Sequence, residues 1–200
     1  MLSKVILLAL LVAIASAALQ SRARQNFNCD DLLNRQIAIE FEASHMYLSA
    51  SNFFAHDRVA LHGFAKIFRA DWKEELEHVE KLVNYGIMRG SNVITPAVPK
   101  QDDAQWESKT VCDIIHDTLN FEKKVNDHLH TLHKCADANY DPQFQDFIES
   151  EFLKGQFDGN KELADLLTRL ERATQVVHQN GTTTSTCDGL GLHLIDKELQ

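Results

Sequence analysis

Apolar residues recur every three or four positions over most of this chain, and this spacing predicts helices rather than strands. In the first such segment, Leu33, Ile37, Phe41 and Leu48 share one face of a helix. The pattern predicts four long helices and a short fifth, with bounds accurate to a few residues. The expected helices cover residues 31–54, 59–89, 108–137, 142–174 and 190–199.

The breaks between these segments indicate how the helices are connected. The first two helices are separated by a short break, as are the third and fourth, where Asp141-Pro142 has the residue types of a helix start. Short connections join antiparallel neighbours, whereas residues 90–107 are long enough to cross a bundle. Residues 181–187 are polar and Thr-rich, which predicts a linker. The fold class expected is therefore all-α: a four-helix bundle with one long crossover and a short C-terminal helix.

Each long helix also carries a polar residue on its apolar face. Glu40 interrupts the first helix, Glu75 and His78 the second, Glu122 the third and Gln156 the fourth. A buried carboxylate costs on the order of several kcal/mol unless it is paired or binds a metal. One imidazole cannot neutralise three carboxylates, and no Lys or Arg occupies these inward positions. A cation is the expected counter-charge, and carboxylates with one imidazole favour a metal such as iron.

The spacing within the second helix supports a metal site. Glu75 and His78 are three residues apart and share one helical face, as in carboxylate-bridged di-iron bundles. Each of these residues alone is more often a surface group, and Tyr47 alone is more often a core residue with a hydrogen-bonded hydroxyl. The coincidence of one inward ligand per helix, at about the same depth, is what indicates the site.

The charge balance narrows the classes of partner. The chain has 29 Asp and Glu against 20 Lys and Arg, a formal net charge of −9. Binding to nucleic acid depends on Lys and Arg that neutralise phosphates, so no nucleic-acid partner is expected. An acidic surface suits cations.

Residues 1–17 have the order of a secretory signal peptide. Lys4 precedes an apolar run that ends in the small residues Ala15-Ser16-Ala17. The run is shorter than the roughly 20 residues of a spanning helix, so an uncleaved anchor is the less favoured alternative. We expect residues 18–200 to form one domain, secreted or held in the secretory-pathway lumen, without a membrane segment. Asn180-Gly181-Thr182 is then a glycosylation sequon.

The four cysteines do not have the spacing of a zinc site. Cys112 and Cys135 fall in one predicted helix, about 34 Å apart along its axis, so they cannot pair with each other. Cys29 and Cys187 lie outside or at the edge of the bundle. Two interpretations stay open, a link between subunits and free, half-buried thiols.

Several segments resemble animal ferritins, and the resemblance covers nearly the whole chain after the signal peptide. Asn34-Arg35-Gln36-Ile37-Ala38-Ile39-Glu40 is similar to their first helix, and Glu74-Glu75-Leu76-Glu77-His78 to their second. Phe121-Glu122-Lys123-Lys124-Val125-Asn126 and the segment from Asp141-Pro142 to Glu149 resemble the third and fourth helices. The similarity is to the catalytic, heavy-type chain, and the signal peptide is typical of secreted invertebrate ferritins.

This resemblance implies a function. It is the oxidation of two Fe(II) by O2 at a di-iron site, with the ferric product stored as mineral in a 24-subunit cage. The cage would contain this chain alone or also a second ferritin chain type. By the resemblance the first iron is held by Glu40, Glu75 and His78, with Glu75 bridging, and Glu122 completes the second iron beside Gln156 and Tyr47.

Other roles are implied at the ends and on the inner face of the subunit. His133, Asp146 and Glu149 resemble residues of a three-fold channel whose acids attract cations. The inner-face acids linked to mineral nucleation correspond to Glu74, Glu77 and Glu80. Two residues of the short fifth helix, Leu190 and Leu194, would line an apolar four-fold channel.

Two other functions serve as alternatives. Gly155 replaces the acid that often precedes the active-site glutamine, and Gly159 follows in the same helix. These glycines favour a catalytically slow storage or transport subunit of a mixed secreted ferritin as one alternative. The other is a four-helix cytokine-like ligand, whose core would be apolar, so the inward Glu and His residues argue against it.

Overall fold

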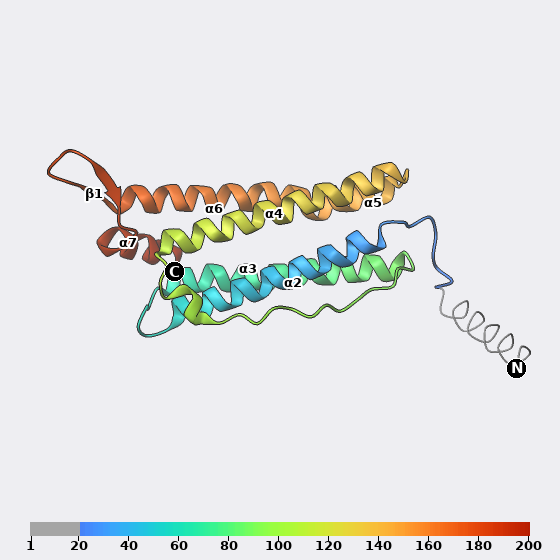
Figure 1. Ribbon diagram of the computed structural model, residues 1–200, viewed down its shortest axis with the longest axis horizontal. Helices are drawn as coiled ribbons and strands as arrows, with labels where there is room; N and C mark the ends of the chain where they lie inside the picture. Colours follow the sequence, from blue (N-terminus) through green and yellow to red (C-terminus); the bar gives the residue numbers. More distant parts are fainter. Residues whose placement is uncertain (1–20) are drawn as a thin grey trace, which may run out of the picture.

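A computed structural model describes residues 21–200, which form an all-α bundle (Figure 1). The signal peptide predicted for residues 1–17 lies outside the described residues. The bundle consists of α2 (Asp30–Ala55), α3 (His62–Met88), α4 (Val111–Ala138) and a fourth helix in three successive segments. These segments are α5 (Pro142–Ile148), η2 (Glu149–Leu153) and α6 (Lys154–Ala173), and the short α7 (Gly189–Leu199) follows. The predicted fold class is confirmed.

Figure 1 shows the helices as two adjacent pairs, α2 beside α3 and α4 beside the fourth helix. Residues 89–110 connect the pairs and run along the length of the bundle, as predicted. A short 3-10 turn, η1 (Asp103–Trp106), fixes this connection to α2. Trp106 is buried, and its Nε1 donates a hydrogen bond to Oγ of Ser49 at 3.0 Å. Ser49 Oγ in turn donates to the carboxylate of Asp103 at 2.9 Å.

Side chains near the helix ends explain where several helices begin. Thr110 and Asp113 form a capping box at the start of α4. Asp141 accepts a hydrogen bond from the amide of Phe144, and Pro142 occupies the first turn of α5. The sequence predicted this helix start correctly.

The fourth helix is not the uninterrupted helix predicted for residues 142–174. Residues Glu149–Leu153 form a π-helical turn, which adds one residue to the usual hydrogen-bonded ring. The turn shifts the phase of α6 relative to α5 and buries both Phe152 and Leu153. Such turns are frequent at functional sites, and Gln156 follows this one by a single helical turn.

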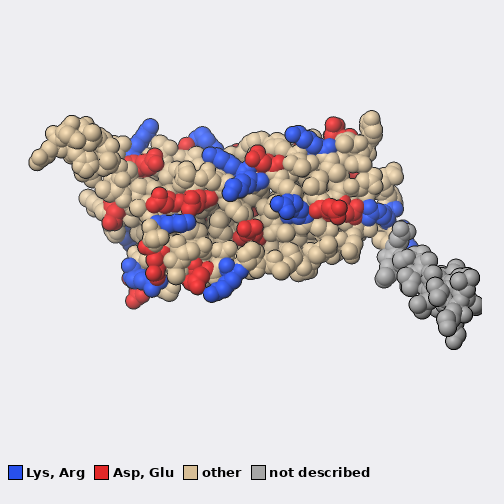
Figure 2. Space-filling model, viewed as in Figure 1, with Lys and Arg blue, Asp and Glu red and all other residues tan. Residues whose placement is uncertain are grey.

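The polar segment 181–187, predicted to be a linker, takes part in a β-hairpin. β1 (Gln175–Val177) pairs in antiparallel register with β2 (Thr183–Ser185), and Val176 lies opposite Thr184. The alternation of β-branched residues in this short stretch was too brief to distinguish it from a loop. The hairpin projects beyond the bundle and carries no Lys, Arg, Asp or Glu (Figures 1 and 2). Asn180 lies in its turn, where its side chain accepts a hydrogen bond from the Thr182 hydroxyl.

The apolar core is divided into two clusters. In α2, Glu40 lies between Ile37 of one cluster and Ala43 of the other. The same division recurs in α3, where Glu75 lies between Phe68 and Val79. The inward polar residues therefore occupy one level of the bundle, with apolar packing on both sides of them.

Both cysteine interpretations are wrong for this structure. The disulfides are Cys29–Cys135 and Cys112–Cys187, with Cα–Cα distances of 6.1 and 5.7 Å, and no cysteine among the described residues is free. The first bridge joins the start of α2 to the last turn of α4. The second joins the start of α4 to the residue before the N-cap of α7. The paired cysteines are 106 and 75 residues apart in the sequence. Their pairing could not be predicted from the sequence, because only the packing of the helices brings them together.

Within residues 21–200, none of the helices combines the length and the apolarity needed to cross a membrane. Figure 2 shows acidic and basic side chains intermingled over the face of the bundle.

Candidate metal centre

Three of the predicted ligands come together in the middle of the bundle. One ligand atom from each of Glu40, Glu75 and His78 can be chosen so that all lie within 4.8 Å of one another. Glu40 comes from α2, whereas Glu75 and His78 lie one turn apart on α3. The Nδ1 atom of His78 is 3.1 Å from Oε2 of Glu75. The grouping predicted for the first iron is therefore present as geometry.

Glu122 of α4 forms the second part of the centre. The hydroxyl of Tyr47 donates a hydrogen bond to Oε1 of Glu122 at 2.7 Å, and Nε2 of Gln156 donates to Oε2 at 2.5 Å. Gln156 also donates to the backbone oxygen of Glu122 at 3.1 Å. Glu122 is thus in direct contact with both side chains predicted beside it at the second iron.

Burial makes the charges of this centre costly. Glu40, Glu75 and Glu122 are only 1%, 6% and 5% exposed. Burial raises the pKa of Glu40 and of Glu75 well above the usual range, and neighbouring carboxylates raise each further. Burial also raises the pKa of Glu122, although the hydrogen bonds from Tyr47 and Gln156 oppose the shift.

No basic side chain offsets this cost. Among the described residues, no Lys or Arg forms an ion pair with any of the three glutamates. Oε2 of Glu40 is buried and has no hydrogen-bond partner. An acceptor in this state is destabilising unless a proton or a cation occupies the space beside it. The donor set of carboxylate oxygens and one imidazole fits a divalent metal such as iron.

Asp71 is an acidic residue of the cavity beside the centre that the predicted ligand set does not contain. It lies one turn before Glu75 on α3 and lines the same cavity. Burial, followed by the charges of Glu74, Glu122 and Glu162, raises the pKa of Asp71 to about 7. Gln36, which donates to Oε1 of Glu40 at 2.6 Å, was not singled out at all. Its position four residues before Glu40 on the same helical face was the available signal.

A cavity of about 580 Å³ lies beside the centre, lined mainly by α3 and α6. Its lining extends from Glu75 and Glu122 to the exposed side chains of Glu74 and Glu162. Gly155 and Gly159 belong to this wall, and a Cβ built on either of them meets no atom within 4 Å. The two glycines therefore widen the cavity and are not required by close packing.

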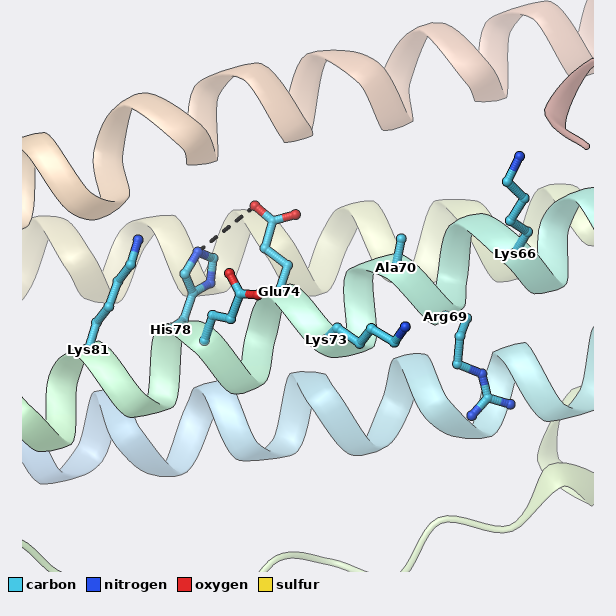
Figure 3. A pocket seen from close by; sticks show the side chains of 8 residues that line it. Lys66, Arg69, Ala70, Lys73, Glu74, His78 and Lys81 are labelled. Atoms are coloured by element: carbon cyan, nitrogen blue, oxygen red, sulfur yellow. Dashed lines mark ion pairs between the residues drawn. The ribbon is translucent and has the colours of Figure 1, made fainter.

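The predicted nucleation residues Glu74, Glu77 and Glu80 are all exposed on α3. Figure 3 shows Glu74 beside the basic side chains of Lys66, Arg69, Lys73 and Lys81. The shallow pocket there, about 550 Å³, is lined by Glu74 and Glu77 together with Lys66, Arg69, Lys73 and Lys81. Oε1 of Glu74 lies 4.0 Å from Nε2 of His78, which connects this surface to the centre. The surface is of mixed charge rather than purely acidic.

The predicted channel residues lie near one end of the bundle. Nε2 of His133 is 2.6 Å from Oε1 of Glu149, and Asp146 is exposed about one turn before Glu149. On α7, Leu190 and Leu194 are 73% and 59% exposed, which leaves an apolar face uncovered in the single chain. The structure places all five at the surface, and their channel roles stay predictions.

The chain is similar in sequence to known proteins. A sequence profile for a ferritin-like domain matches residues 30–173. A chloroplastic ferritin of Malus baccata var. xiaojinensis is 40% identical over 166 residues, which is 80% of this chain and 66%, just under two thirds, of that protein. Soma ferritin of Lymnaea stagnalis is 38% identical over 180 residues, 89% of this chain and 95% of the snail protein. The lower-subunit ferritin of Aquarana catesbeiana is 37% identical over 156 residues, 77% of this chain and 89% of that protein.

The profile covers most of the bundle, and the snail relative is matched over nearly its whole length. The matched region contains every residue of the buried centre, from Glu40 to Gln156. The chain belongs to the ferritin family.

Proposed function

We propose that this chain stores and detoxifies iron as a ferroxidase subunit, oxidising Fe(II) to Fe(III) with O2 at a di-iron site. The observation that carries the proposal is the set of three buried glutamates, contributed by three helices, with one histidine nearby and no Lys or Arg partner within residues 21–200. Two bound Fe(II) ions supply the positive charge that this arrangement lacks. Iron is here the substrate and the cargo of the protein.

The geometry suggests a role for each ligand. Glu75 lies close to Glu40 and His78, and the charge of Glu122 also acts on Glu75. Glu75 is therefore suited to bridge two ions, while Glu122, oriented by Tyr47 and Gln156, completes the second site. Two ions held this close can each give one electron to the same O2 molecule. The acid-lined cavity between α3 and α6 offers a route for cations.

The proposal extends to assembly and location. The exposed leucines of α7 suit contacts with further copies, in a 24-subunit cage that encloses the ferric mineral. A second ferritin chain type could share that cage. The apolar run and small residues of positions 1–17 support secretion, after which residues 18–200 would be the mature subunit.

A slow storage or transport subunit is the alternative. Gly155 and Gly159 support it, because they leave open space beside Gln156. Loss of the groups that support a metal ligand typically costs about 10- to 100-fold in metal affinity or activity. The rate of oxidation distinguishes the two functions.

The test is aerobic Fe(II) oxidation by residues 18–200, followed by near-ultraviolet absorbance. The double variant Glu75→Ala with His78→Ala should fall to the rate in buffer, while light scattering shows an unchanged particle mass. His116→Ala with Glu171→Ala, which alters exposed residues of α4 and α6, is the matched control and should keep the full rate. An unmutated shell that oxidises Fe(II) no faster than buffer would contradict the ferroxidase and leave the storage subunit.

A further inference from the structure

His128 of α4 is a half-buried histidine that the centre described above does not use. It lies six residues after Glu122, about 9 Å further along the helix, on the flank that packs against α2. Its Nδ1 is 2.5 Å from Oε1 of Gln36, and Nε2 of Gln36 donates to Oε1 of Glu40 at 2.6 Å. Three side chains from two helices thus form one chain of hydrogen bonds that ends on a metal ligand.

Chemistry fixes the direction of each hydrogen bond. The ionised form of Glu40, which is the form that binds a metal, only accepts hydrogen bonds, so the amide nitrogen of Gln36 faces it, as in the structure. The amide oxygen of Gln36 then faces His128, which requires that Nδ1 of His128 carries the proton and donates. Burial, with a smaller contribution from Arg35, lowers the pKa of His128, which agrees with a neutral ring. Nε2 of His128 is buried and has no partner among the described residues.

The consequence falls on Glu40. Its Oε1 is occupied by Gln36, and its Oε2 is buried without a hydrogen-bond partner among residues 21–200. One of its two carboxylate oxygens lies within 4.8 Å of ligand atoms of Glu75 and His78. Gln36 alone could turn its amide by half a rotation and present oxygen to the carboxylate, which would repel it. The donor on His128 prevents this rotation, because the turned amide would place its own N–H groups against Nδ1–H.

We propose that His128 is a positioning residue of the metal centre, which acts through Gln36 to hold Glu40 with one oxygen free for the metal. The inference rests on the proposed metal centre and adds to it the side chain that orients one ligand. Removal of a residue that hydrogen-bonds a metal ligand typically lowers metal affinity by roughly 10- to 100-fold.

The experiment titrates Co(II), a probe that O2 does not readily oxidise at such a site, onto the metal-free shell and records its visible absorption. His128→Ala should weaken Co(II) binding about tenfold or more and change the intensity of the band. His128→Asn should restore both, since its amide nitrogen occupies nearly the position of Nδ1 and donates to Gln36. Alanine is compatible with a half-exposed helix position, so His128→Ala should fold. His128→Leu fills the space of the ring without a hydrogen-bond donor and should weaken Co(II) binding as His128→Ala does.

Three comparisons decide the outcome. Gln36→Ala should weaken binding as much as His128→Ala, and the double variant should lose no more than Gln36→Ala alone. His116→Ala, an exposed histidine of the same helix, should bind as the unmutated protein does. Unchanged affinity and band in His128→Ala, or equal loss in His128→Asn and His128→Ala, would overturn the proposal. If instead Glu75→Ala with His78→Ala binds Co(II) normally, the metal centre itself is misplaced.

Discussion

At the scale of single residues, the buried carboxylates of the candidate metal centre lower the stability of the metal-free fold. Burial raises the pKa values of Glu40, Glu75 and Glu122 in the metal-free fold. A group whose pKa is raised on folding stabilises the fold at low pH and loses that contribution as pH rises through the folded pKa. Under the proposed function, cations that bind the ionised carboxylates would reverse this loss, because they would bind only the folded arrangement.

Asp71 gives a direct test of this reasoning. Its pKa is about 7 in the folded chain, against an ordinary value of 3.8, so its ionised form is destabilising above pH 7. In metal-free protein, Asp71→Asn should raise the free energy of unfolding more at pH 8 than at pH 5. The difference between the two gains should be at most about 2–3 kcal/mol. Chemical denaturation at the two pH values measures the difference. Asp127→Asn, an exposed control on α4, should show no such dependence, and an equal gain for Asp71→Asn at both pH values would refute the prediction.

At the scale of elements, the C-terminal helix completes the helix that carries Glu75 and His78. The start of α3 has no side-chain cap of its own. Instead, Asp196 of α7, which is 2% exposed, accepts hydrogen bonds from the amides of Gly63 and Phe64 at 2.7 and 3.1 Å. A carboxylate at this position satisfies orphan amides and interacts favourably with the positive end of the helix dipole.

Removal of this cap should therefore loosen both helices. Asp196→Ala is expected to cost roughly 1–2 kcal/mol of unfolding free energy, the range for lost N-caps. Hydrogen exchange measured by mass spectrometry should rise in the first turn of α3 and throughout α7. Lys197→Ala, an exposed neighbour, is the control. Unchanged exchange at residues 62–65 would show that the cap does not hold α3.

Two glycines, one in α6 and one in α7, differ in the space around them. A Cβ on Gly191 of α7 would overlap the carbonyl oxygen of Ala173 at the end of α6, whereas one on Gly159 meets nothing. Gly191→Ala should lower the melting temperature and detach α7. Gly159→Ala should raise stability by about 1 kcal/mol, the helix propensity gain of Ala over Gly. Calorimetry of the two variants checks the prediction, and a shift of the same sign in both would contradict it.

At the scale of the whole molecule, two disulfides tie the bundle together. Cys29–Cys135 closes a separation of 106 residues between α2 and α4, and Cys112–Cys187 holds α7 against α4. Long loops gain most from a cross-link, because the bridge restricts the unfolded chain. The bridges also suit the secretory location that we propose for the chain.

Both bridges lie within one chain, which predicts a clear result on gels. Under non-reducing denaturing conditions the subunit should migrate as a monomer, and faster than after reduction. Cys29→Ser with Cys135→Ser should lower the free energy of unfolding by roughly 2–5 kcal/mol. Cys112→Ser with Cys187→Ser tests the second bridge by the same measurement. Covalent dimers on the non-reducing gel would support a link between subunits and oppose the structure.

The sequence by itself determined the helices, their order and most of the centre. A 3.6-residue period and scarce glycine and proline are local properties, so the bounds of α2, α3, α4 and α7 agree with the predicted ones within a few residues. The inward glutamates could be predicted because a charged residue on the apolar face of a helix is recognised from the sequence of that helix alone. Glu40, Glu75, His78, Glu122 and Gln156 all lie where this reasoning placed them.

Only the tertiary structure decided the features that depend on two distant segments. The cysteine pairing, the cap that Asp196 provides for α3, and the hydrogen bond from His128 to Gln36 each join residues on different helices. The π-helical turn in the fourth helix and the hairpin after it have too few residues to produce a periodic signal. Helices form from local backbone preferences and one apolar face, whereas contacts between them depend on how those faces pack.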